Sequence, residues 1–200
     1  MLKQNKTIVA LSLMSLFLAC GCTTADPIES MDNEQTEKQW LSNNYTGFDY
    51  SRGQLNVSGD GTAVTAYLPC ETLVSCEIKP LFTNGSFDLL CGYTSAPIYY
   101  EMTSLSAPSV LSGIIFRISQ TNITLLYVEN YKETELGNVS FTFGEKRDVV
   151  FGKNSESVIL KIDGDIVFEE KTALDVGNYY GFGVHSGTIL RVYDIVEGSP

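Results

Sequence analysis

Apolar residues recur at every second position in short runs along most of this 200-residue chain, and turn residues separate the runs. Ile114 and Phe116, for example, share one face of such a run, and Arg117 lies on the other. A period of two indicates a strand with one buried face, whereas a helix repeats its apolar residues every three or four positions. About a dozen such runs predict an all-β sandwich or barrel. The predicted strands are Gln54–Ser58, Thr62–Leu68, Thr72–Lys79, Ser86–Tyr93, Ile98–Thr103, Val110–Ser119, Ile123–Glu129, Val139–Phe143, Arg147–Phe151, Ser157–Ile162, Ile166–Glu169, Tyr179–His185 and Ile189–Val196.

The dipeptide Asn84-Gly85 separates two of these runs and predicts a tight hairpin, because both residue types tolerate positive φ angles. Pairing the strands about this turn places Cys91 diagonal to Cys76, which predicts a disulfide in an oxidising compartment. The third cysteine of the domain, Cys70, would then be free. The alternative is that all three are buried, reduced thiols.

The last third of the chain resembles a known fold family. Val158–Phe168 reads as a strand, an Asp-Gly turn and a strand, Gly177–Gly187 as the strand that follows, and Ile189–Val196 as the closing strand of concanavalin A-like and laminin G-like jelly rolls. The resemblance implies a sandwich of two antiparallel sheets. This fold serves lectins, glycosidases, lyases and adhesion modules alike, so it does not identify a function.

Within Gly177–Gly187 the alternation separates two faces. Tyr180, Phe182 and Val184 are expected in the core, and Gly181 and Gly183 would let a neighbouring element approach the other face. The preceding Asp163-Gly164-Asp165 turn lacks the further oxygen ligands of a calcium loop, so a plain hairpin is expected and no metal or cofactor is assigned.

The N-terminus predicts export. Two lysines precede the apolar run Ile8–Ala19, which as a helix would span about 18 Å, too short for a hydrocarbon core of about 30 Å. Phe17-Leu18-Ala19-Cys20 resembles the lipobox of bacterial lipoproteins, which implies lipidation of Cys20. Two alternatives are lipidation of Cys22 and an ordinary signal cut after Ala25. The expected organisation is a signal peptide over residues 1–19, a flexible acidic tether over 20–38 and one jelly-roll domain over 39–200.

Charge and compartment limit the partners. The chain has 24 Asp and Glu against 13 Lys and Arg, a net charge of −11. Such a domain is poorly suited to nucleic acid or long polyanions, since phosphate neutralisation needs clustered cations. The leader predicts a lipid-anchored protein of the cell envelope, at the outer membrane or cell surface, or otherwise a secreted one. Glycans or other surface ligands are therefore the expected partners.

The sequence assigns no catalytic residue. The Glu-x-Asp-x-x-Glu strand of retaining glycosidases of this fold is absent. Five single acids on strands or nearby are expected to be solvated, although they could meet in space: Glu77, Asp88, Glu101, Glu129 and Asp194. The only histidine, His185, shares a predicted face with Tyr179, which is one arrangement for the acid/base pair of a polysaccharide lyase. The alternative is a hydrogen-bonded surface histidine at a strand end.

Aromatic side chains near strand ends suit the apolar faces of sugars, and they also suit protein interfaces. The candidate ligand-binding residues are Tyr99, Tyr100, Tyr127, Tyr131, Tyr179 and His185. The favoured function is non-catalytic binding of a carbohydrate or surface ligand. The alternatives are a glycoside hydrolase or polysaccharide lyase of the same fold, and a structural envelope or adhesion subunit.

Overall fold

A computed structural model describes residues 40–42, 47–67, 73–82, 84–93, 112–129, 132–154, 156–171 and 177–198. All of them belong to the second of two units, which begins at Lys38. Within these ranges no helix is long and apolar enough to span a membrane. Several residues considered above lie outside the described ranges: Cys20, Cys22, Ala25, Cys70, Tyr99, Tyr100, Glu101 and Tyr131.

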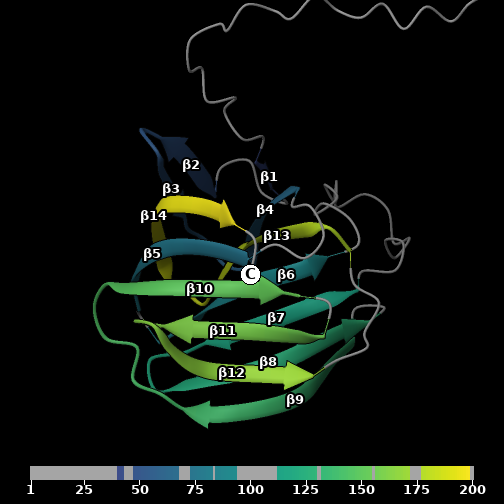
Figure 1. The fold of residues 1–200 in the computed structure, drawn as a ribbon. Helices are drawn as coiled ribbons and strands as arrows, with labels where there is room; N and C mark the ends of the chain where they lie inside the picture. The colour runs from purple at the N-terminus through teal and green to yellow at the C-terminus, as the bar shows by residue number, and fades with distance from the viewer. Residues whose placement is uncertain are drawn as a thin grey trace, which may run out of the picture. The chain divides into compact units, whose positions relative to one another are not determined.

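The described residues form two antiparallel sheets, each of seven strands, which confirms the all-β prediction. Sheet A has the order β1-β4-β13-β6-β7-β8-β9, and sheet B the order β12-β11-β10-β5-β14-β3-β2. Figure 1 shows the two sheets stacked face to face. The strands are β1 Leu41–Ser42, β2 Phe48–Ser51, β3 Gln54–Val57, β4 Thr62–Tyr67, β5 Leu73–Leu81, β6 Ser86–Tyr93, β7 Gly113–Ile118, β8 Asn122–Glu129, β9 Lys132–Ser140, β10 Arg147–Lys153, β11 Ser157–Ile162, β12 Asp165–Lys171, β13 Tyr179–His185 and β14 Ile189–Gly198.

One hydrophobic core fills the space between the sheets and draws residues from both. Tyr180, Phe182 and Val184 of β13 are fully buried in it, as the alternation predicts. Trp40 joins the same core, with its ring centroid 5.6 Å from that of Tyr180 and 6.0 Å from that of Phe182. In the described part of the domain, the inner faces of the strands are therefore occupied by packing, and their outer faces and ends remain available to a ligand.

The Asp163-Gly164 turn is a two-residue hairpin, as predicted. Both residues have positive φ, 52° and 88°, and Ile162 pairs with Asp165 across the turn. This is the combination that a type I′ turn requires. The Asp163 carboxylate accepts hydrogen bonds from the Arg147 side chain and from the backbone N–H of Asp148, so its oxygens hold the end of sheet B together.

The predicted hairpin at Asn84-Gly85 is wrong. β5 pairs with β10 and β14 in sheet B, whereas β6 pairs with β13 and β7 in sheet A, so this connection crosses between the sheets. Asn84 has the expected positive φ of 97°, but Gly85 does not share it. A Cβ on Gly85 would lie 2.0 Å from the carbonyl oxygen of His185, so glycine is needed there for a close backbone approach.

The predicted Cys76–Cys91 disulfide fails with that hairpin. The two residues lie in different sheets, and both are free, buried thiols of the core. Burial raises the pKa of Cys91 to about 12, and burial together with Asp148 raises the pKa of Cys76 further. The thiolate is the reactive form of cysteine, so both side chains behave as small apolar core residues in the folded protein.

Candidate functional site

The outer face of sheet A carries a group of charged side chains. Alternation sends Phe87, Leu89 and their equivalents inward, so the intervening positions of β6, β7, β8 and β13 point outward. Asp88 pairs with Arg117 of β7 on one side and with Gly183 of β13 on the other. These neighbours bring charges from distant parts of the sequence onto one surface.

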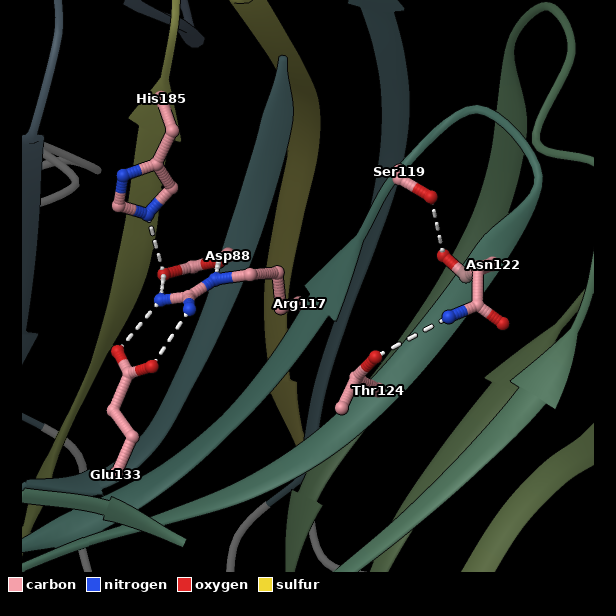
Figure 2. A network of polar contacts seen from close by, with 7 residues as sticks. All are labelled: Asp88, Arg117, Ser119, Asn122, Thr124, Glu133 and His185. Carbon is pink, nitrogen blue, oxygen red and sulfur yellow. Dashed lines mark hydrogen bonds and ion pairs between the residues drawn. The ribbon is translucent and has the colours of Figure 1, made fainter. Parts of the chain in front are cut away.

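Four side chains on this face form a continuous charged network, His185–Asp88–Arg117–Glu133, shown in Figure 2. Arg117 donates to both oxygens of Asp88, from Nε at 2.9 Å and from Nη2 at 3.0 Å. It also donates to both oxygens of Glu133, from Nη1 at 2.8 Å and Nη2 at 2.9 Å. His185 Nε2 lies 2.8 Å from Asp88 Oδ2. A guanidinium held by two carboxylates has little rotational freedom, so the network is rigid.

Asp88 is the buried centre of this network, and its side chain is only 4% exposed. Burial by itself would raise the pKa of Asp88, but the hydrogen bonds from His185 and Arg117 and their positive charges lower it below its usual value. The carboxylate is therefore ionised at neutral pH. The expectation of a solvated acid at Asp88 is wrong, because a single acid on a strand does not reveal that two cations lie beside it.

The ionised Asp88 also determines how the His185 ring is protonated. A carboxylate can only accept hydrogen bonds, so Nε2 of His185 carries a proton and Nδ1 faces away from Asp88. The hydrogen bond to Asp88 raises the pKa of His185, against burial and the repulsion of Arg117. Asp60 adds a smaller attraction, and its carboxylate accepts a hydrogen bond from the backbone N–H of Ser186.

We expect the free energy of unfolding to be greatest between about pH 3.8 and about pH 6.5. The raised pKa of His185 stabilises the folded state fully at pH values below the ordinary histidine pKa of 6.5. This stabilisation is lost as the pH rises through the folded-state pKa. The lowered pKa of Asp88 stabilises the folded state at pH values above the ordinary aspartate pKa of 3.8. This stabilisation is lost as the pH falls through the folded-state pKa. Because the His185 ring is about a third exposed, its share is about 1 kcal/mol or less.

Urea unfolding at about pH 5.5 and about pH 8.5 measures the alkaline side of this dependence. His185→Gln keeps a hydrogen-bond donor for Asp88 but does not titrate. Its free energy of unfolding should therefore differ less between the two pH values than that of the wild type. An equal difference in both proteins would show that another group is responsible.

Next to the network, polar side chains of β8, of β9 and of the β7–β8 turn form a second group. Asn138 Nδ2 donates to Thr124 Oγ1 at 3.0 Å, and Asn122 Nδ2 lies 3.4 Å from the same oxygen. Ser119 Oγ donates to the carbonyl oxygen of Asn122 at 3.1 Å (Figure 2). Thr124 pairs with Arg117 across the β7–β8 ladder, so this group continues the polar surface of the network towards β9.

Farther along the outer face of sheet A, away from Thr124, the outward-facing side chains are apolar and buried. The members of this second hydrophobic cluster are Leu90, Tyr93, Ile115, Leu126 and Val128. Tyr93 lies over Gly113, where a Cβ would be 2.7 Å from its ring. Within the described part of sheet A, the network keeps accessible polar atoms on the outer face, because the side chains of His185 and Glu133 are 35% and 44% exposed.

The structure brings together some of the predicted ligand-binding residues and separates others. Tyr179 and His185 lie on the same face of β13, but they stand at opposite ends of the strand, about 20 Å apart. Tyr179 packs edge to face against the exposed Tyr67, with ring centroids 5.8 Å apart. Tyr127 packs against the inner core and lies 3.4 Å from Ser112 through its hydroxyl. It is not part of the surface that carries His185.

The roles of Arg117 and Glu133 are not apparent from the sequence alone. A signal for Arg117 and Asp88 was present: each is a single charge inside a strongly apolar strand, and the two charges are opposite. Sheet order is what shows that they pair, because Asp88 lies 29 residues from Arg117 and 97 from His185 in the sequence. Glu133 lies on β9, which begins at Lys132, whereas the sequence predicted a strand only from Val139.

The network provides a fixed set of hydrogen-bonding groups. Among the described residues, no group of three or more His, Cys, Asp and Glu side chains is arranged to hold a metal ion. Asp88 is buried and accepts hydrogen bonds at both oxygens, whereas Glu133 and His185 keep part of their surface in solvent. The network can therefore accept and donate hydrogen bonds to an uncharged polar ligand without a change of its own structure.

No protein-family model matches the chain, and no curated protein matches it by sequence. Solved structures do match. The carbohydrate-binding module CBM66 from Bacillus subtilis aligns with a TM-score of 0.64 at 10% identity, over 81% of this chain and 96% of that one. The β-glucanase of Bacillus licheniformis aligns with a TM-score of 0.58 at 11% identity, over 84% and 95%. A Bacillus subtilis protein of unknown function with a galectin-like fold aligns with a TM-score of 0.58 at 9% identity, over 82% and 90%. These likenesses concern the fold, and they confirm that the domain is a concanavalin A-like jelly-roll sandwich.

Proposed function

We propose that this domain binds carbohydrate without catalysis, at the polar end of the outer face of sheet A. The single observation that carries the proposal is the rigid His185–Asp88–Arg117–Glu133 network, half-exposed at Glu133 and about a third exposed at His185. Polar groups held in place before the ligand arrives lose little entropy on binding. The fold similarity to a carbohydrate-binding module supports the same function.

The alternative of a glycosidase is less well supported. Such an enzyme needs one carboxylic acid that stays protonated and a second carboxylate beside the scissile bond. The lowered pKa of Asp88 works against a proton donor, and both of its oxygens accept hydrogen bonds from Arg117. Glu133 is paired with the same guanidinium. A lyase that uses His185 as a base would need its imidazole neutral, which the raised pKa of His185 opposes.

Binding of the full chain, purified in detergent, to an array of glycans tests this function. We expect the wild-type protein to bind at least one glycan. His185→Ala should bind the same glycan about tenfold more weakly, because it removes one hydrogen-bonding group from the network. Glu170→Gln on β12 of sheet B is the matched control, because this exposed residue lies in the other sheet. Release of shorter products from an unmodified polysaccharide would instead favour the enzyme, and no retained glycan would favour a structural role.

We further propose that the protein is anchored in the cell envelope by a lipid on Cys20. The support is the lipobox-like Phe17-Leu18-Ala19-Cys20 after a short apolar run. Radiolabelled palmitate should enter the wild type and not Cys20→Ala. Label that is lost only in Cys22→Ala would move the lipid to that residue, and absence of label from the wild type would favour an ordinary signal cut after Ala25.

A further inference from the structure

The hydrogen bonds of Arg117 limit the ligands that the network can take. The guanidinium has five N–H groups, and four of them are directed at Asp88 and Glu133. A ligand carboxylate binds arginine best through two parallel N–H donors. Only one N–H of Nη1 is left, so a carboxylate could make that contact only by displacing Asp88 or Glu133.

The charges around the site oppose an anionic ligand as well. Arg117 is neutralised by two carboxylates, and Asp60 lies near His185 on the other side. Glu135 is exposed on the same outward side of β9 as Glu133. The sum over the network is zero or negative whether or not the imidazole is charged, and the whole chain is at −11. A uronate or a sulfate would therefore meet no net positive potential here.

The hydrogen-bonding groups that remain available to a ligand include both acceptors and donors. Glu133 accepts hydrogen bonds through its exposed carboxylate oxygens, and the free Nη1–H of Arg117 donates beside it. The Nδ1 atom of His185 faces away from Asp88 at the other side of the network. A hydroxyl group both donates and accepts, so two neighbouring hydroxyls can donate to Glu133 and accept from Arg117 at the same time.

From this geometry we infer that the ligand is an uncharged sugar whose neighbouring hydroxyl groups bind between Glu133 and Arg117. The inference rests on the proposed function, and it makes Glu133 a ligand-contacting residue. It excludes sugars that are recognised through a carboxylate or sulfate group.

Matched pairs of polysaccharides test the inference. The full chain in detergent is titrated calorimetrically with neutral glucan, mannan and galactan and with the same polymers carboxylated at C6. We expect the neutral member of the recognised pair to bind at least about tenfold more tightly. Glu133→Gln should weaken its binding by about tenfold, because a charge-assisted acceptor is lost, while Glu170→Gln should leave it unchanged.

The outcomes separate the inference from the proposed function. A carboxylated polymer that binds as tightly as its neutral counterpart, or more tightly, overturns the inference and leaves carbohydrate binding intact. Unchanged binding by Glu133→Gln overturns the placement of the hydroxyls at this residue. No binding to any of these polymers, together with no glycan retained on the array, overturns both proposals.

Discussion

Arg117→Leu should lower the free energy of unfolding by about 3 kcal/mol, because it removes two of the three side-chain hydrogen bonds to a buried carboxylate. Asp88 is 4% exposed and would keep only the hydrogen bond from His185. Urea unfolding followed by the fluorescence of Trp40 measures the loss, since this is the only tryptophan and it lies in the core. Glu133→Gln, which removes the exposed partner of the same guanidinium, should cost less than about 1 kcal/mol.

The double variant Asp88→Leu/Arg117→Leu distinguishes an unpaired charge from lost packing. Leu90 and Ile115 flank these positions on the outer face and are already part of the buried apolar cluster. Two leucines would extend that cluster, so the double variant should lie within about 1 kcal/mol of the wild type. A double variant that is less stable than Arg117→Leu alone would contradict this account of the network.

The strands that the sequence predicted best are short, largely buried runs with turn residues beside them. β6, β11 and β13 have the predicted bounds, and nearly all of their residues are buried. The sequence predicts the start of β9 seven residues too late. Lys132–Leu136 is exposed and carries three charged side chains, and an edge strand with few buried residues has no apolar period to detect.

The pairing of strands was less predictable than their positions. Asn84-Gly85 has the composition of a hairpin turn, but the strands on either side enter different sheets. A local turn signal cannot distinguish a hairpin within one sheet from a connection between two sheets. Both need a sharp change of direction, and only the strands that become partners differ. The same limit applies to the candidate site. His185 is a candidate from its residue type alone, whereas Asp88 and Arg117 lie beside it because the strand order is β13-β6-β7.

Gly181→Ala is expected to destabilise the domain by about 3 kcal/mol, through a clash within sheet A. Its Cβ would lie 1.9 Å from the carbonyl oxygen of Val64 and 2.8 Å from Cα of Thr65. Both atoms belong to the backbone of β4, so no side chain can rotate away and the two strands must move apart. A gain of about 0.4–1 kcal/mol from the stiffer unfolded chain offsets only part of this cost.

Gly183→Ala is the matched control, two residues along the same face of β13. Its Cβ would meet Asp88 Cβ at 3.4 Å and the carbonyl oxygen of Thr62 at 3.6 Å, which are ordinary van der Waals contacts. We expect its free energy of unfolding to stay within about 1 kcal/mol of the wild type in the same urea experiment. Equal losses in the two variants would mean that any side chain on this face is harmful, and a neutral Gly181→Ala would show that β4 can shift. A large loss at Gly181 alone would establish that this glycine is needed where β4 approaches the β13 backbone, on the same strand face that carries His185.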